Sequence, residues 1–166
     1  MNTDVIRPFQ PSDIPELTAL RVRNNAFLMP FEPERPEGFL TEEGQRAWLG
    51  SGGGVRLAIL DQDAIVGVIS LSEIVRGPLQ SASVGYWVSQ DRNGRGLASQ
   101  ALAALVEHAF TELGLHRLEA GTLVDNVASQ RVLVRNGFTR IGVARKHLLI
   151  GGLWRDHVLY ELLADD

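Results

Sequence analysis

The stretch that decides the fold is Asn93-Gly94-Arg95-Gly96-Leu97-Ala98-Ser99, because of the segments on either side of it. The preceding run, Val84-Gly85-Tyr86-Trp87-Val88, is β-branched and aromatic, which predicts a buried strand. From Leu97 to Leu113, apolar residues recur at three- and four-residue spacing, which predicts an amphipathic helix. The glycines therefore lie where a strand passes into the first turn of a helix.

A helix start of this kind is suited to binding phosphate. The first backbone N–H groups of a helix have no intrahelical acceptor, and the helix dipole adds partial positive charge there. Gly94 and Gly96 let a ligand approach the main chain, and Arg95 adds a permanent positive charge. A glycine-rich turn can equally serve only to reverse the chain. No Gly-Lys-Ser/Thr ending is present, which excludes a nucleoside triphosphate P-loop, and Ser99 in place of a third glycine disfavours a dinucleotide-binding fold.

Length and composition are typical of one globular domain over residues 1–166. The net charge of −4 gives no support for nucleic acid binding and suits an amine-bearing substrate. Cysteine is absent, which excludes a catalytic thiol, and the four histidines lack zinc-binding spacing, so we expect no metal. Met1 to Asp4 show no basic and apolar leader, and no apolar run approaches ~18 residues, so we expect a cytoplasmic protein outside the membrane.

The remaining segments predict a mixed order of strands and helices. Ser12 is suited to cap a first helix that carries Ile14, Leu17, Leu20 and Val22. Further helices are expected at 41–49, 97–113 and 126–135, and strands at 5–9, 55–60, 65–74, 84–88, 116–124, 139–150 and 154–163. Because helices alternate with strands only in part, this order favours an α/β fold with one mixed sheet of about seven strands and helices on both faces.

A segment from Phe27 to Gly38 combines aromatic residues with prolines at positions 30, 33 and 36. Prolines at this density disfavour regular structure, so we expect a loop with large apolar side chains. Such a loop can fold back onto the core, or it can form a lip over a substrate. In the second case Phe27, Phe31 and Glu32 are the candidate substrate contacts.

With this order in view, the chain resembles the GNAT superfamily of acyl-CoA-dependent N-acetyltransferases. Asn93–Ala98 matches the superfamily's Arg/Gln-x-x-Gly-x-Gly/Ala pyrophosphate loop in all but its first residue. Within the superfamily, the chain is similar to the RimJ/RimL ribosomal-protein N-acetyltransferases in Asn126-x-x-Ser129, Asn136-Gly137-Phe138 and the run from Leu148 to Leu159. The resemblance covers essentially the whole chain and implies direct attack of a neutral amine on the thioester of acetyl-CoA.

The resemblance implies that acetyl-CoA lies along the predicted strand and the glycine-rich turn. In the superfamily the strand before this turn diverges from its neighbour, so the backbone N–H groups of Trp87 and Val88 would stabilise the oxyanion of the thioester carbonyl. The alternative is that both are ordinary core residues of a strand. The pyrophosphate would contact Asn93, Gly94, Arg95, Gly96, Leu97, Ala98 and Ser99, with no side-chain contact assigned to Asn93, which departs from the family pattern.

Asn126 and Ser129 are three residues apart near the start of a predicted helix, so both can face one ligand. In the resembling family the Asn holds the cofactor arm, and the Ser hydroxyl lies near the sulfur as a proton donor to the leaving thiolate. The same residue types also suit an N-cap at Asn126 and a first-turn backbone contact by Ser129. Asn126 can do both.

The base that deprotonates the amine is harder to assign. RimL-type enzymes use a strand glutamate, and the matching segment Lys146-His147-Leu148 has none. Glu119 is our candidate, as in a related family; its alternative is a solvated or ion-paired carboxylate. His147 and His157 are further candidates, and each is more typical of a structural hydrogen-bonding histidine. A chain-terminal amine, with a pKa near ~8, is about 3 kcal/mol easier to deprotonate than a lysine near ~10.4, so the lack of an obvious base favours an α-amine acceptor.

The sequence therefore predicts an acetyl-CoA-dependent N-acetyltransferase that acts on the N-terminal α-amine of a protein of the ribosomal type. One alternative keeps the cofactor and changes the acceptor to a small amine such as a polyamine, an amino acid or an antibiotic. A second is a non-catalytic acyl-CoA-binding module. The expected partners are acetyl-CoA and the acceptor, without nucleic acid or membrane, in a monomer or a homodimer.

Overall fold

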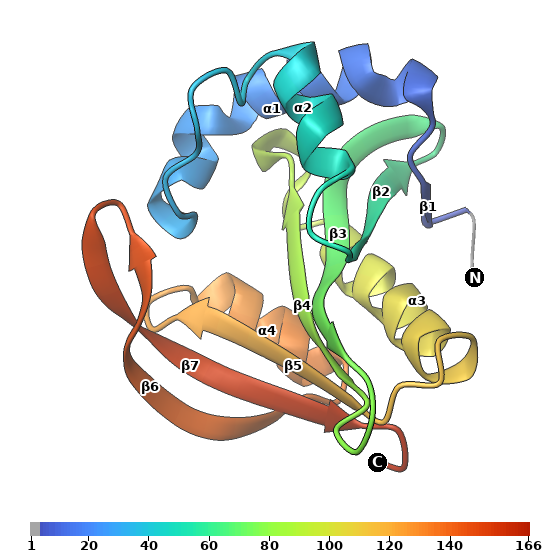
Figure 1. Cartoon of the computed structure of the whole chain (residues 1–166), viewed down its shortest axis with the longest axis vertical. Coiled ribbons are helices and arrows are strands. Elements are labelled where there is room, and N and C mark those ends of the chain that lie inside the picture. The colour runs from blue at the N-terminus through green and yellow to red at the C-terminus, as the bar shows by residue number, and fades with distance from the viewer. Residues whose placement is uncertain (1–3) are drawn as a thin grey trace.

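A mixed sheet of seven strands, in the order β1-β2-β3-β4-β5-β7-β6, forms the centre of the computed structural model, which describes residues 4–166 (Figure 1). Neighbouring strands are antiparallel except β4 and β5, which are parallel. This confirms the expected mixed α/β fold; residues 1–3, considered above for a leader, lie outside the described residues. In chain order the strands are β1 (Ile6–Pro8), β2 (Val55–Asp61), β3 (Ala64–Val75), β4 (Ser81–Val88), β5 (Arg117–Leu123), β6 (Thr139–Ile150) and β7 (Leu153–Leu163).

Helices cover both faces of the sheet, as predicted (Figure 1). They are α1 (Ile14–Leu28), α2 (Glu42–Leu49), α3 (Leu97–Thr111) and α4 (Val127–Arg135), with short 3-10 turns η1 (Pro11–Asp13), η2 (Met29–Phe31) and η3 (Gln90–Arg92). Helices α3 and α4 pack on one face, and α1 and α2 lie on the other. Within residues 4–166, none of these helices has the length and apolarity to cross a membrane.

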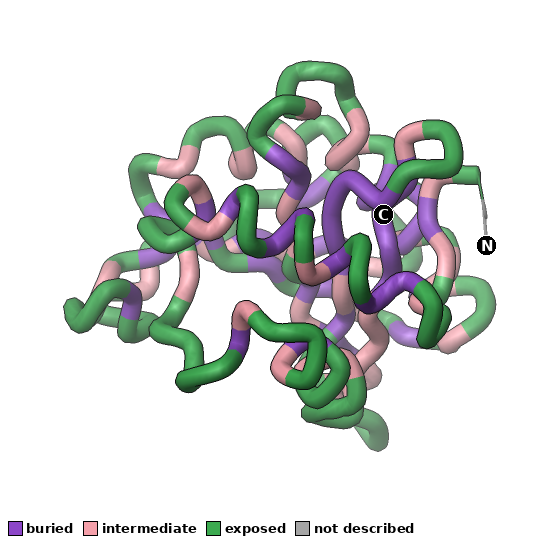
Figure 2. Tube along the Cα trace, turned by 90° about the horizontal axis from the view of Figure 1, so that it is seen from above, coloured by how far each residue is buried: buried purple, intermediate pink, exposed green. Residues whose placement is uncertain are grey.

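The period of two along β4 distributes its side chains between these layers. Val84 and Val88 belong to the large core against α3, whereas Trp87 packs on the opposite face with Leu20 and Ile65. Figure 2 shows the buried residues gathered in the interior of the trace and the exposed ones in the peripheral loops. The central strand therefore contributes to both sides of the molecule.

The first helix differs from its sequence prediction at its start. Ser12 lies within η1 and does not cap α1, which begins at Ile14. The turn is instead held by Asp13, whose carboxylate accepts from the Gln10 backbone N–H at 2.7 Å and from Arg7 at 2.6 Å. The Asp13 carboxylate thus satisfies the backbone amide of Gln10, at the start of the 3-10 turn that precedes α1.

The apolar face of α1 was also predicted incorrectly at Val22, which is 51% exposed. Arg21 and Asn24 are buried in its place, because Arg21 pairs with Glu32 and Asn24 hydrogen-bonds to Ser89. Tertiary polar contacts have replaced the expected apolar periodicity. The helix also continues through residues 27 and 28, so the proline-rich loop begins later than expected.

Strands β4 and β5 pair over only three residues each, Ser81–Ser83 with Arg117–Glu119. Beyond these residues the two strands diverge (Figure 1). The divergence opens the middle of the sheet and leaves one edge of β4 without a strand partner over its second half.

Gly67 on β3 lies opposite Val88, where the diverging half of β4 is still held by its other neighbour. A Cβ at position 67 would overlap the carbonyl oxygen of Trp87 and lie 3.0 Å from the Val88 Cα, and neither backbone atom can turn away. We expect Gly67→Ala to lower the free energy of unfolding by about 1–3 kcal/mol, measured by urea denaturation.

The matched control is Gly142→Ala in β6, where an added Cβ meets nothing within 4 Å. Its stability should stay within about 0.5 kcal/mol of the parent or rise, because alanine costs less conformational entropy in a strand than glycine. Equal unfolding midpoints for the two variants would contradict the steric argument.

Candidate functional site

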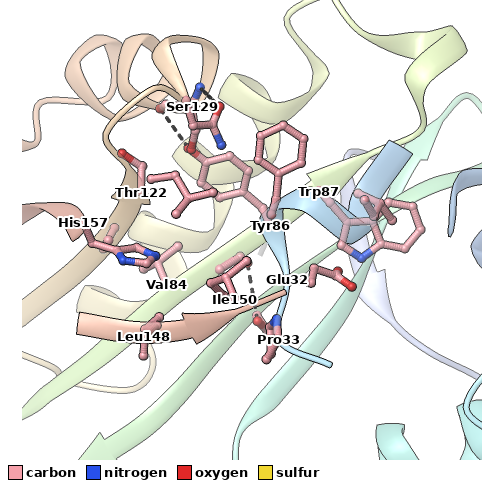
Figure 3. Close-up of a pocket in the computed structure, with 18 of the residues that line it drawn as sticks. Glu32, Pro33, Val84, Tyr86, Trp87, Thr122, Ser129, Leu148, Ile150 and His157 are labelled. Atoms are coloured by element: carbon pink, nitrogen blue, oxygen red, sulfur yellow. Dashed lines mark hydrogen bonds between the residues drawn. The ribbon is translucent and has the colours of Figure 1, made fainter. Parts of the chain in front are cut away.

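The gap between β4 and β5 leads into a cavity of about 280 Å³ (Figure 3). Gly85 on β4 and Gly121 on β5 both line it, and both are exposed although each lies in a central strand. A strand residue without a side chain leaves the floor of the gap open. Side chains from α4, the loop after α1, and the β6–β7 hairpin complete the walls.

Two hydroxyl groups meet on the α4 side of this cavity (Figure 3). The Tyr86 Oη donates to the Ser129 backbone oxygen at 3.1 Å and lies 2.9 Å from the Ser129 Oγ. Burial raises the pKa of Tyr86 to about 12, against the opposing effect of its hydrogen bond to Ser129. The phenol is therefore protonated throughout the physiological range and holds the Ser129 side chain in place.

Asn126 fixes the same helix end. Its Oδ1 accepts from the Ser129 backbone N–H at 3.3 Å, so Asn126 caps α4 and also lines the cavity. The structure thus brings together Asn126 and Ser129 as the sequence predicted. Tyr86 was interpreted only as part of a buried strand; its place beside Ser129 depends on the packing of α4 against β5, which local sequence does not encode.

The backbone of β4 presents two amides to the gap. Ser89 N donates to the Val66 oxygen of β3 at 2.7 Å. Because N–H groups alternate between the two edges of a strand, the amide of Trp87 also faces β3, and the amides of Tyr86 and Val88 face the side where β5 has diverged. The expectation for the Trp87 amide is therefore wrong. The expectation for the Val88 amide fits this geometry, and the second amide that faces the gap belongs to Tyr86.

The turn predicted to bind pyrophosphate has the geometry of a helix start. Gly94 and Gly96 have φ of +79° and +76°, which other residues adopt only with strain, and Gly96 is the N-cap of α3. Gln100 N donates to the Gly96 oxygen at 3.0 Å, so the amides of residues 97–99 lie ahead of the first bond within the helix. These amides are available to an anion.

Two arginines flank this turn. Arg95 is exposed, and its Nη1 lies 3.6 Å from the Asp61 Oδ2, which also accepts from the Arg92 Nη1 at 2.6 Å. The Asp91 Oδ2 also lies 3.7 Å from the Arg92 Nε, so two carboxylates balance the two guanidinium groups, and Arg95 remains exposed beside the turn. Asn93 is exposed there as well. Sequence reasoning named Arg95 and missed Arg92, which becomes relevant only through Asp61.

Residues of the predicted lip lie on the opposite side of the sheet. Phe31 and Glu32 line the cavity, whereas Phe27 does not; its ring packs edge-on against Phe31 with centroids 6.1 Å apart. Glu32 forms an ion pair with the buried guanidinium of Arg21 and lies 3.5 Å from the Arg35 Nε. Glu32 is thus an anchored carboxylate, and Phe27 reaches the cavity only through Phe31.

The prediction that Glu119 is the base is wrong. Glu119 pairs with Ser83 at the closed end of the β4–β5 ladder and does not line the cavity. Its carboxylate accepts from the Arg117 Nε at 2.6 Å, and Arg117 also pairs with Glu161. The structure therefore supports the alternative, in which Glu119 is an ion-paired carboxylate. Glu119 lies at the last paired position of β5, and the strands part only after it.

Within residues 4–166, Glu32 is the only carboxylate that pairs with the buried Arg21, and the Arg21 Nη1 has no hydrogen-bond partner there. We expect Glu32→Gln to lower the free energy of unfolding by about 3 kcal/mol, because a buried cation would lose its counter-charge. Thermal and urea unfolding would measure this loss. Glu34→Gln, at an exposed neighbouring position, is the control and should change stability by less than about 0.5 kcal/mol. Similar values for both variants would refute the role of the pair.

Comparison with known proteins agrees with this geometry. The acetyltransferase (GNAT) domain matches residues 5–139. The probable N-acetyltransferase YjcK of Bacillus subtilis is 35% identical over 99% of this chain and 96% of its own. The ribosomal protein uS5-alanine N-acetyltransferase of Escherichia coli is 34% identical over 98% of this chain and 88% of its own. Mycobacterium smegmatis RimJ in complex with CoA-disulfide superimposes with a TM-score of 0.88 at 31% identity, covering 96% of this chain and 81% of that one. The chain therefore belongs to the GNAT family of acetyltransferases.

Proposed function

We propose that this protein transfers the acetyl group of acetyl-CoA to the N-terminal α-amine of a protein. The observation that carries the proposal is the unpaired edge of β4, where the amides of Tyr86 and Val88 face the gap beside a cavity that Tyr86 and Ser129 line. Two relatives support the acceptor, since the Escherichia coli enzyme is named for ribosomal protein uS5-alanine acetylation and the Mycobacterium smegmatis structure is a RimJ.

The residues present fit acetyl-CoA. The amides at 94–99 and the exposed guanidinium of Arg95 suit its pyrophosphate, and Asn126 lies where the cofactor arm would pass toward the cavity. Bound acetyl-CoA supplies a thioester carbonyl as the electrophile. The Val88 amide would donate to the oxyanion that forms on this carbonyl, at no cost of reorganisation because the strand already holds it in place.

Ser129 would serve the leaving group. Its Oγ is held by the Tyr86 hydroxyl at 2.9 Å, and the high pKa of Tyr86 keeps that partner protonated. When Ser129 gives its proton to the thiolate, the Tyr86 hydroxyl can turn from the Ser129 backbone oxygen and donate to the Ser129 Oγ instead. A thiol with a pKa near ~8.5 already leaves readily, so this assistance is modest.

The shape of the acceptor side favours a peptide over a small amine. Beyond the cavity lies a groove of about 660 Å³, and the two spaces share Glu32, Pro33 and Arg35 in their walls. The groove runs between the loop after α1, the residues before α2, and Gly151 at the β6–β7 turn. A single small amine would leave most of this volume unfilled, whereas an extended peptide could place its first amine in the cavity and its following residues in the groove.

A thiol-release assay with a panel of amines tests the acceptor. Peptides beginning with Ala or Ser should release coenzyme A thiol at least tenfold faster, by kcat/KM, than spermidine, free amino acids or an N-terminally blocked peptide containing lysine. A preference for spermidine or a free amino acid would overturn the acceptor assignment. Absence of thiol release with every amine would overturn catalysis altogether.

Ser129→Ala should lower kcat about tenfold and leave the Kd for coenzyme A within about twofold, because the proposed contact strengthens as charge develops on sulfur. Steady-state kinetics and calorimetry measure the two quantities. Tyr86→Phe should lower kcat less, since Ser129 retains its place at the start of α4 through Asn126. An unchanged kcat in Ser129→Ala would remove this residue from the mechanism.

A further inference from the structure

We propose that His157 is the catalytic base, and that its Nε2 takes the proton from the acceptor ammonium. The inference rests on the proposed N-acetyltransferase function and deepens it. The sequence favoured a structural hydrogen-bonding role for this histidine, and the cavity gives it a second one.

The position of His157 brings its ring to the cavity. It lies on β7, opposite Leu123 of β5 and Ala144 of β6, and is 3% exposed while lining the cavity. Figure 3 shows the imidazole on a different wall from the Ser129–Tyr86 pair, with Leu148 nearby. A base and a proton donor on separate walls leave the space between them for the reacting groups.

The hydrogen bond of the ring fixes which nitrogen is free. The Nδ1 lies 3.1 Å from the Arg155 backbone oxygen, and a carbonyl oxygen can only accept. The proton of the neutral ring is therefore on Nδ1, and the lone pair is on Nε2. This is the tautomer that a base needs if Nε2 is to receive a proton.

The glycine on the neighbouring strand keeps the ring accessible. Gly121 and His157 lie on the same face, and a Cβ at position 121 would come within 3.9 Å of the His157 Cβ and Cδ2. With glycine there, no side chain at position 121 lies against this edge of the imidazole. The wall of β5 thus leaves room for an amine beside the ring.

The surroundings of His157, and above all its burial, favour the neutral form of its ring. Burial lowers its pKa below the ordinary value of 6.5, and the nearby His147 and Arg155 act in the same direction. The Arg155 carbonyl and Asp156 oppose this shift, but Asp156 points to the other face, where its Oδ1 accepts from the Lys146 N at 2.7 Å. His157 is therefore uncharged and able to accept a proton at pH 7.

The other titratable side chains on the described cavity wall do not meet this requirement. Glu32 is paired with Arg21 and Arg35, and Arg35 is itself a cation. Tyr86 remains protonated up to a pKa of about 12. His157 combines a free lone pair with a neutral resting state.

The proton transfers balance as follows. The acceptor ammonium loses one proton to Nε2, and the freed nitrogen lone pair forms the new C–N bond while the C–S bond of the thioester breaks. The thiolate takes a proton from the Ser129–Tyr86 hydroxyl pair, and the second proton, which leaves the nitrogen as the amide forms, passes through solvent to restore that pair. Overall, ammonium and thioester give amide, thiol and one proton, which leaves His157 for solvent.

His157→Gln should lower kcat about 100-fold at pH 7, and the deficit should shrink as the pH rises past ~8, where an α-amine is already neutral. In the parent protein the acid limb of the kcat profile should lie below pH 6.5. His116→Gln, an exposed position at the start of β5, is the matched control and should keep the parent profile. A His157→Gln deficit that is the same at every pH, or a kcat within twofold of the parent, would overturn the proposal.

A second measurement does not depend on folding of the variant or on turnover. Nitrogen NMR of the imidazole in the parent protein should show a proton on Nδ1 and a titration midpoint below 6.5. A proton on Nε2 in the neutral ring would overturn the proposal. The two proposals fail separately: preference for a small amine overturns the α-amine acceptor, whereas parent-like kcat of His157→Gln toward whichever amine is accepted overturns the base.

Discussion

Strands β4 and β5 share hydrogen bonds over three residues each, and the whole site depends on where that pairing stops. In a closed parallel ladder, the amides of Tyr86 and Val88 would be bonded to β5 and unavailable to a ligand. Because the strands part after Ser83 and Glu119, these donors face the gap between the strands instead. The sheet stays intact around the gap because β4 remains paired with β3 from Ser83 to Val88 and β5 remains paired with β7 along its full length.

The same divergence joins the two faces of the sheet. Alternate side chains of β4 point to opposite layers, so Tyr86 meets Ser129 below α4 while Trp87 lies under the guanidinium of Arg21 on the α1 side. In the proposed reaction, a thioester held along the strand would be reached from one face by the leaving-group donor and from the other by the amine. The cofactor and the acceptor would thus approach from opposite faces of the sheet.

Local sequence patterns predicted most of this architecture. The strands and the later helices follow from periodicity, and the strand, turn and helix around Gly94 and Gly96 are where the sequence predicted them. The errors occur where tertiary contacts decide. Arg21 is buried because Glu32 comes back to it from the next loop. Glu119 was chosen by residue type, yet one more residue along β5 separates the closed ladder from the gap, and no local pattern marks that point.

The pKa of the acceptor amine decides how readily His157 can deprotonate it. A histidine with an ordinary pKa near 6.5 lies ~1.5 units below a chain-terminal amine and ~4 below a lysine, so proton transfer to it is uphill by about 2 and about 5 kcal/mol respectively. Burial of His157 lowers its pKa and makes both transfers harder, but their difference of about 3 kcal/mol is unchanged. The selection against lysine side chains and polyamines therefore comes from the pKa of the amine itself, before any contact in the groove, and a weak base such as His157 does not offset it. This chemical selection acts in the same direction as the groove, whose size suits a peptide beginning with a free α-amine.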